Sequence, residues 1–223
     1  MSENILPFVE VNPKRPHDAV VIWLHGLGDS GNGFAPIVPE LKLPDSLAIR
    51  FVFPHAPMRA ITINNGMSMR AWYDIKTLDF NHRADVEGVK DSAKQVVELI
   101  EHEIAKGIPS ERIVLAGFSQ GGVIALDIAA RYTKKLAGVL ALSTYMSEPE
   151  KLAKEAVDIN KDTPFLCAHG QQDEMVPMFL GHAAYKVLEQ NGFAVEWKDY
   201  LMQHNVCAQE LQDISAWLQK TLK

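Results

Sequence analysis

The sequence predicts an α/β fold in which a mostly parallel central sheet is covered by helices on both faces. Short apolar runs of strand length alternate with segments of helical period along the whole chain. Most of these runs are continuously apolar, as expected for strands that are covered on both sides. We find no repeat, low-complexity segment or linker, so residues 1–223 are predicted to form a single domain.

Six segments are predicted to be strands: 20–24, 50–53, 113–116, 136–142, 164–168 and 195–200. The last of them alternates between polar and apolar residues, which is typical of an edge strand. Helices are predicted over 34–41, 85–106, 120–129, 148–156, 177–190 and 208–222. The strongest is 85–106, whose apolar residues recur on one face and which is followed by Gly107 and Pro109.

Composition and charge exclude several classes of protein. The hydrophobic fraction of 47% supports a large core, and the net charge of −6 without a basic stripe argues against nucleic acid as a main partner. The two cysteines, Cys167 and Cys207, are too few for a disulfide scaffold. The sequence has no signal-peptide pattern and no apolar stretch near the ~20 residues that span a membrane. We therefore expect a cytoplasmic protein.

The segment Gly117-Phe118-Ser119-Gln120-Gly121 lies between a predicted strand and a predicted helix. This is the context of the nucleophile elbow, G-x-S-x-G, in which a tight turn exposes a serine hydroxyl to a base. Side chains two residues before and after Ser119 would collide, and Gly117 and Gly121 remove them. The Gln120 N–H is placed to stabilise an oxyanion. The alternative is that Ser119 merely caps the helix.

An acid and a histidine must follow the serine in this order if the elbow belongs to a catalytic triad. Asp173 follows the strand 164–168, and Glu174 is its rival. Of the two later histidines, His182 falls within a predicted helix, whereas His204 falls in a loop after a strand. Loops at the carboxyl ends of strands carry the chemistry in open α/β sheets. We therefore choose Asp173 and His204.

A glycine-rich loop, residues 26–31, matches G-x-G-x-x-G after a strand and could indicate a dinucleotide site. The next strand ends at Phe53-Pro54-His55 without the acidic residue that such a site needs. The loop is better interpreted as the second half of an oxyanion hole, with the N–H of Leu27 as donor. His25 and His169 are expected to shape loops through hydrogen bonds. We predict no metal and no cofactor.

Residues 55–80 form a long stretch without a clear period but with many apolar side chains. Loops of this length are often functional. We interpret 57–74 as a mobile flap that lines the substrate site beside Ser119 and contacts a membrane surface, with Asn64-Asn65-Gly66 as a turn or hinge. The alternative is that its side chains complete the core. The candidate substrate-binding residues are Ile61, Met67, Met69, Trp72 and Met175.

These motifs together resemble the small α/β-hydrolase group of carboxylesterases and acyl-protein thioesterases. The matching segments are 25–29, 54–57, 72–74, 117–122, 169–173 with 176–177, and 204–206. The resemblance implies Ser119, Asp173 and His204 as the triad and Leu27 and Gln120 as oxyanion donors. It also implies activity on carboxylic esters, acyl thioesters of lipidated proteins, or lysophospholipids. Gln203 departs from the glycine usual before the histidine, and would be strained if its φ were positive.

The spacing leaves no room for a cap domain, because only 53 residues separate Ser119 from Asp173. We therefore expect a shallow, open site and an acyl-enzyme mechanism. Two other functions stay open at this point. One is a catalytically silent binding module on the same fold, and the other is a peptidase. A homodimer is kept as a partner hypothesis.

Overall fold

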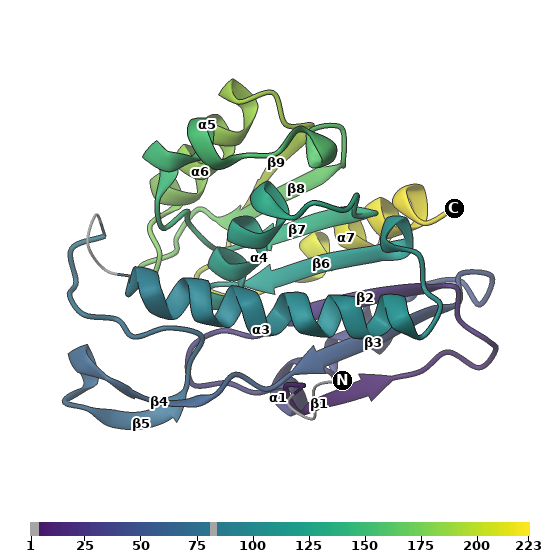
Figure 1. Ribbon diagram of the computed structural model, residues 1–223, viewed down its shortest axis with the longest axis horizontal. Helices are drawn as coiled ribbons and strands as arrows, with labels where there is room; N and C mark the ends of the chain where they lie inside the picture. The colour runs from purple at the N-terminus through teal and green to yellow at the C-terminus, as the bar shows by residue number, and fades with distance from the viewer. Residues whose placement is uncertain (1–4, 81–83) are drawn as a thin grey trace.

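A seven-stranded sheet forms the centre of the computed structural model, which describes residues 5–80 and 84–223 (Figure 1). Its strand order is β1-β3-β2-β6-β7-β8-β9, and every neighbouring pair is parallel except β1 with β3. The strands are β1 (Phe8–Val11), β2 (Ala19–Leu24), β3 (Ile49–Pro54), β6 (Ile113–Phe118), β7 (Gly138–Leu142), β8 (Phe165–Gly170) and β9 (Val195–Tyr200). The predicted α/β fold with a mostly parallel sheet is confirmed.

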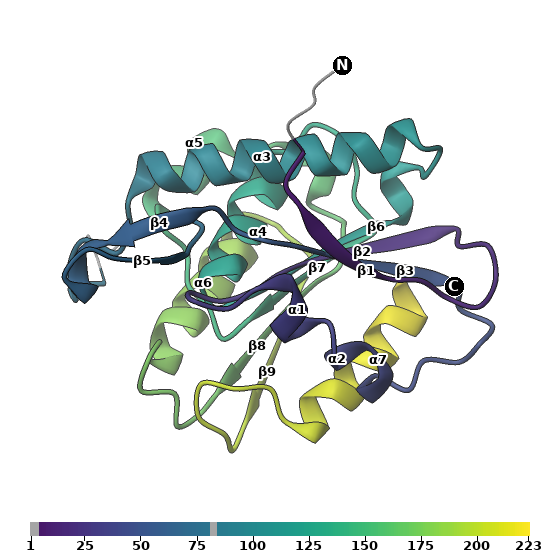
Figure 2. The same ribbon diagram turned by 90° about the horizontal axis from the view of Figure 1, so that it is seen from below.

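Helices cover both faces of this sheet, as Figure 2 shows from its edge. One face carries α3 (Val86–Ala105), α4 (Gln120–Arg131), α5 (Leu152–Glu155) and α6 (Met178–Gln190). The other carries α1 (Gly31–Phe34), α2 (Ile37–Glu40) and α7 (Ala208–Thr221). Single 3-10 turns lie at Thr62–Asn64, Ser110–Arg112, Pro149–Lys151 and Asp158–Asn160. The sheet thus separates two apolar clusters, one under each helical layer.

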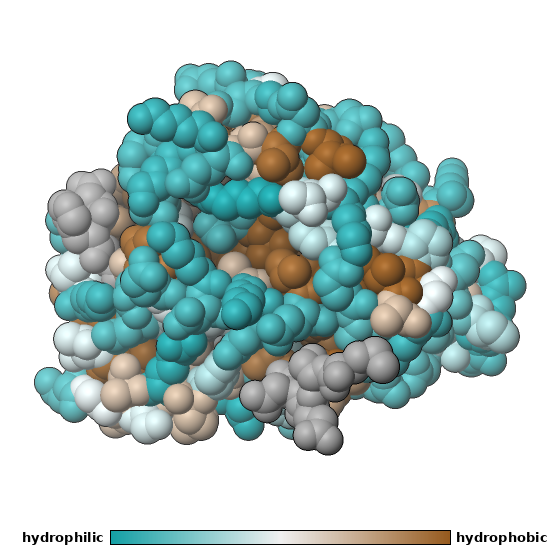
Figure 3. All heavy atoms as spheres, viewed as in Figure 1, coloured by the Kyte–Doolittle hydropathy of each residue, from teal (hydrophilic) through white to brown (hydrophobic). Residues whose placement is uncertain are grey.

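Helix α3 is amphipathic in the way its sequence predicts. Val89, Val96 and Ile100 are buried against the sheet, while the outer surface of this face is mostly hydrophilic (Figure 3). The helix also buries Glu103, which forms an ion pair with the buried Arg50 of β3. The helix therefore docks through apolar contacts together with a charge pair that is shielded from water.

Three parts of the fold differ from the sequence-based expectation. Strand β1 is absent from the predicted strands, because its four residues carry only a weak pattern. The expected helix over 34–41 is instead two single turns, α1 and α2, with Pro36 between them. The expected loop within 55–80 contains an antiparallel hairpin, β4 (Met58–Ile61) and β5 (Met67–Arg70).

Parallel strands place the candidate site at one edge of the sheet. Strands β6, β8 and β9 all run in the same direction, so the residues that follow them meet at their carboxyl ends. Ser119, Asp173 and His204 follow these three strands. Within the described ranges, no helix is both long and apolar enough to cross a membrane.

Candidate active site

Ser119 lies at a sharp turn between β6 and α4. Its φ of 54° and ψ of −120° are unusual for a residue other than glycine. A Cβ at Gly117 would lie 2.3 Å from the carbonyl oxygen of Gly121, and one at Gly121 would lie 2.4 Å from that of Leu24. The prediction that both glycines are needed for close approach is therefore confirmed.

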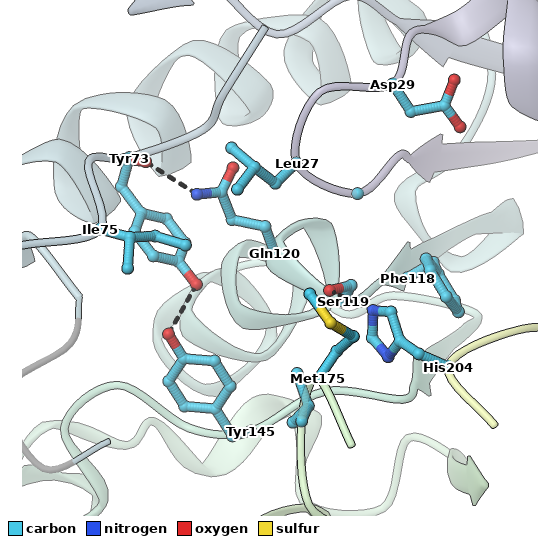
Figure 4. A pocket seen from close by; sticks show the side chains of 12 residues that line it. Leu27, Asp29, Tyr73, Ile75, Phe118, Ser119, Gln120, Tyr145, Met175 and His204 are labelled. Carbon is cyan, nitrogen blue, oxygen red and sulfur yellow. Dashed lines mark hydrogen bonds between the residues drawn. The ribbon is translucent and has the colours of Figure 1, made fainter. Parts of the chain in front are cut away.

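Three side chains from separate loops form a continuous hydrogen-bonded chain. The His204 Nε2 lies 2.9 Å from the Ser119 Oγ, and the His204 Nδ1 lies 2.7 Å from the Asp173 Oδ2. A carboxylate can only accept, so Nδ1–H donates to Asp173 and leaves Nε2 free to accept the serine hydroxyl proton. Figure 4 shows the His204 ring beside Ser119. The arrangement suits removal of a proton from the serine.

Asp173 is held as an anion in a buried place. Burial acts to raise its pKa, but hydrogen bonds with His169 and His204 and with the Val176 N–H hold the pKa well below its ordinary value. Its Oδ1 accepts from the backbone N–H groups of Met175 at 2.9 Å and Val176 at 2.8 Å. The carboxylate therefore stays charged at neutral pH and orients the His204 ring.

The rival residues lie elsewhere. Glu174 is exposed, although it directly follows Asp173. His182 is exposed on α6, where its ring meets that of Trp197 edge to face at 5.2 Å. The structure therefore brings together Ser119, Asp173 and His204, and it brings neither rival into this chain of hydrogen bonds.

Two buried histidines support the site through hydrogen bonds, as the sequence predicts. His169 Nε2–H donates to the carbonyl of Val176 at 2.8 Å and lies 3.4 Å from the Asp173 Oδ2. His25 donates from Nδ1 to the Gly26 carbonyl at 2.7 Å, and its Nε2 accepts from the Ala56 N–H at 3.0 Å. Burial lowers the pKa of His25, which favours this neutral form.

Gln203 does not have the positive φ that would strain its backbone. Among the described non-glycine residues, positive φ occurs only at Lys42, Asn65, Ser119 and Ser143. The glycine that this loop requires is Gly170, because a Cβ there would lie 2.4 Å from the Gln203 carbonyl oxygen. Glutamine is therefore compatible with this loop.

A cavity of about 200 Å³ opens beside Ser119, and it accounts for only some of the predicted binding residues. Leu27, Gln120 and Met175 are among the residues that line it. Its lining consists of Gly26, Leu27, Asp29, Tyr73, Ile75, Phe118, Ser119, Gln120, Tyr145, Met175, Val176 and His204.

Four of the predicted substrate-binding residues lie outside this lining. Ile61 and Trp72 are fully buried, which places both in the core. Met67 is 64% exposed on the hairpin, and Met69 packs partly against the core. The segment 57–74 therefore has two kinds of residue. Ile61 and Trp72 complete the core, which was the alternative interpretation, whereas Met67 faces solvent.

Sequence reasoning missed Tyr73, Ile75 and Tyr145 as cavity residues. Tyr73, which directly follows the predicted Trp72, lines the cavity, whereas Trp72 does not. Tyr145 follows β7, and its place after a strand at the carboxyl edge is a usable signal. Whether each of these side chains points into the cavity depends on loop conformation. Hydrophobic periodicity does not predict the conformation of a loop.

Comparison with known proteins agrees with this geometry. Residues 7–222 match the model of the family described as Phospholipase/Carboxylesterase. The chain is 38% identical to acyl-protein thioesterase 1 of Cryptococcus neoformans, with 98% of each chain covered. It is 39% identical to that of Gibberella zeae, with 92% of each covered.

Solved structures give the same relationship. The crystal structure of Arabidopsis thaliana SOBER1 superposes with a TM-score of 0.86 at 34% identity, covering 92% of this chain and 99% of that one. Zea mays acyl-protein thioesterase 2 gives a TM-score of 0.87 at 29% identity, covering 97% and 99%. This chain therefore belongs to the phospholipase/carboxylesterase family, a family of hydrolases with the α/β-hydrolase fold.

Proposed function

We propose that this hydrolase cleaves carboxylic esters and acyl thioesters through an acyl-enzyme formed on Ser119. The observation that carries the proposal is the hydrogen-bonded chain from Ser119 through His204 to Asp173, at 2.9 and 2.7 Å, beside a cavity. A serine hydroxyl is a weak nucleophile unless a base stands within hydrogen-bond reach. Here the base is oriented by a buried carboxylate, as the reaction requires.

In the first half of the reaction, the Ser119 Oγ attacks the acyl carbonyl carbon while His204 Nε2 takes the serine proton. The tetrahedral oxyanion is stabilised by the backbone N–H groups of Leu27 and Gln120. Gln120 is the first residue of α4, so its N–H has no acceptor within the helix. When the carbon–oxygen or carbon–sulfur bond breaks, His204 returns the proton to the leaving group.

In the second half, water replaces the leaving group. His204 Nε2 takes a proton from the water as its oxygen attacks the acyl carbon, and gives that proton to the Ser119 Oγ when the bond from the acyl carbon to this oxygen breaks. Asp173 stays ionised throughout and stabilises the imidazolium that forms twice per cycle. The products are a carboxylic acid and an alcohol or thiol, and the enzyme returns to its starting state.

The substrates that we propose are small esters, lysophospholipids and S-acylated proteins. Support comes from the names of the relatives, which are acyl-protein thioesterases, and from the family description. We also propose a transient membrane-surface contact through residues 57–74, since Met58 and Met67 expose 60% and 64% of their surface on the hairpin. A cytoplasmic location is supported by the two cysteines, which are unpaired.

Replacing the serine tests this assignment. Ser119→Ala should reduce kcat toward p-nitrophenyl butyrate and an S-acylated peptide by about 10⁴- to 10⁶-fold. A fluorophosphonate should label the wild-type protein at Ser119, as identified by peptide mass. Ser110→Ala, in a remote 3-10 turn, is the matched control and should keep full activity. Near-normal turnover by purified Ser119→Ala would refute the proposal.

A further inference from the structure

The far wall of the cavity beside Ser119 is formed by two tyrosines whose hydroxyls meet. Tyr73 follows the hairpin and Tyr145 follows β7, and both side chains are almost completely buried. Their hydroxyl oxygens are 2.9 Å apart. In Figure 4 the two rings reach toward each other from opposite sides, and the hydroxyls meet on the side of the pocket away from His204. An acyl chain that enters at Ser119 and extends inward would meet this pair.

A second cavity lies on the other side of Tyr145. It has a volume of about 390 Å³, and Tyr145 lines both cavities. The Phe80 ring meets the Tyr145 ring edge to face at 6.1 Å. The second cavity is lined by Phe80, Tyr145, Met146, Ser147, Pro149, Glu150, Leu180, Ala183 and Ala184. Apart from Ser147 and Glu150, these side chains are largely apolar, which suits an acyl tail.

The side chain of Gln120, at the start of α4, holds the backbone next to the Tyr73–Tyr145 pair in place. The side chain of Gln120, the residue after Ser119, donates from Nε2 to the Tyr73 carbonyl at 2.7 Å. Its Oε1 accepts from the Trp72 N–H, also at 2.7 Å. The backbone that carries the Tyr73 ring is thus fixed to the start of α4. An alkyl chain that entered between the rings would break this hydroxyl contact and could not replace it with a hydrogen bond of its own.

The size of the first cavity sets a scale for the chain that it accepts. Its volume of about 200 Å³ is about half that of the cavity on the other side of Tyr145, which is about 390 Å³. The space beside Ser119 therefore accommodates a short acyl group, and a longer one needs further space.

We propose that the hydrogen-bonded Tyr73–Tyr145 pair limits the length of the acyl chain, and that the cavity behind Tyr145 is an acyl-tail subsite closed by this pair. The inference rests on the proposed function, because it names the acyl group that the same site takes. Tyr145 and Tyr73 are specificity-determining residues in this account. Neither takes part in the proton transfers assigned to His204.

The test is the chain-length profile of kcat/KM for p-nitrophenyl esters from acetyl to decanoyl. For the wild-type protein, kcat/KM should rise up to about the hexanoyl ester and then fall toward the decanoyl ester. Each methylene that leaves water adds about fourfold to binding. Tyr145→Ala joins the two cavities, so its ratio of decanoyl to butyryl kcat/KM should exceed the wild-type ratio by roughly tenfold or more.

Two further variants keep the test decisive. Tyr145→Phe keeps the ring and removes the hydrogen bond, and should raise the same ratio by about two- to tenfold. It decides the question if Tyr145→Ala fails to fold, as judged by circular dichroism. Tyr132→Phe is the matched control, because this buried tyrosine at the end of α4 donates to Glu101 of α3 and lines neither cavity. Its ratio should equal that of the wild type.

The contrary outcomes are distinct from failure of the proposed function. A wild-type protein that cleaves decanoyl esters as readily as hexanoyl esters would overturn the inference, as would variants at Tyr145 that leave the ratio unchanged. Either result would mean that the acyl chain runs along the surface past Met175 instead. Absence of all Ser119-dependent ester cleavage by the wild-type protein would instead reject the proposed function itself.

Discussion

A carboxylate remains charged in a buried place only where hydrogen-bond donors replace the lost water. Asp173 meets this condition with two backbone N–H groups on Oδ1 and the His204 Nδ1–H on Oδ2. Glu174, one residue later, is exposed to solvent. At the scale of single residues, the choice between these two acids therefore depends on which one the loop turns inward.

We predict that Asp173→Asn lowers kcat for ester cleavage by about 10⁴-fold. An asparagine can present an NH₂ group to His204 Nδ1, which favours the tautomer that cannot accept the serine proton. Glu174→Gln is the control and should leave kcat within about twofold of wild type, because surface substitutions of this kind have small effects. Kinetics with p-nitrophenyl butyrate measure both. A larger loss from Glu174→Gln would show that the acid is misassigned.

At the scale of elements, the β4–β5 hairpin sets a buried side chain opposite an exposed one at its loop end. Ile61 is fully buried in the core, whereas its cross-strand partner Met67 is 64% exposed. The loop between them is a 3-10 turn, Thr62–Asn64, followed by Asn65 at φ 53° and Gly66 at φ 74°, both in the left-handed region. The turn or hinge expected at these residues therefore lies in the hairpin loop.

We predict that Ile61→Ala and Met67→Ser separate stability from surface binding. Ile61→Ala removes buried methyl groups and should lower the free energy of unfolding by about 2–5 kcal/mol. Met67→Ser should change it by less than about 0.5 kcal/mol, since its side chain is 64% exposed. Urea denaturation measures both effects.

The same pair tests the proposed membrane contact. Met67→Ser should reduce cleavage of a lysophospholipid presented in phospholipid vesicles more than cleavage of soluble p-nitrophenyl acetate. Equal activity ratios for wild type and Met67→Ser would show that the hairpin tip makes no such contact. A large loss of stability in Met67→Ser would assign this side chain to the core.

At the scale of the whole molecule, the first turn of α7 buries a carboxyl group. Glu210 is fully buried, and neither of its oxygens has a hydrogen-bond partner of normal geometry among the described residues. Burial raises its pKa to about 8, the nearby Cys207 N–H acts in the opposite direction, and the charge of Asp213 raises it further. The folded protein therefore holds a proton on Glu210 at neutral pH.

We predict that this group makes the folded state less stable as pH rises from about 5 to 8. In the unfolded chain Glu210 loses its proton near the ordinary pKa of 4.5, so over this interval the unfolded state binds fewer protons than the folded one. The free energy of unfolding then falls by up to about 1.4 kcal/mol per pH unit, and levels off above the folded pKa.

Glu210→Gln isolates this contribution, because glutamine keeps the shape and cannot ionise. The difference in urea unfolding free energy between wild type and Glu210→Gln should turn against the wild type as pH increases to 8. Measurements at pH 5, 6, 7, 8 and 9 give its slope. A difference that stays constant over these values would mean that Glu210 titrates normally in the folded protein.

Features that depend on local pattern or on order along the chain could be predicted from the sequence alone. The alternation of apolar runs and amphipathic segments predicted the parallel sheet, because buried strands and surface helices have different periods. Gly117 and Gly121 around Ser119 predicted the elbow, because only glycine permits the backbone contacts seen there. The order of serine, acid and histidine then indicated Asp173 and His204.

Features that depend on contacts between distant segments could not be predicted in this way, because they arise when the elements pack. The wall of the cavity beside Ser119 joins Tyr73 to Tyr145, which are 72 residues apart. Ile61 and Trp72 are buried in the core, and Gln203 lacks the positive φ that would strain it. The hydrophobic periodicity of a sequence predicts which face of a helix or strand is buried. It does not predict which loop side chains meet, because the packing of the elements sets the directions of those side chains.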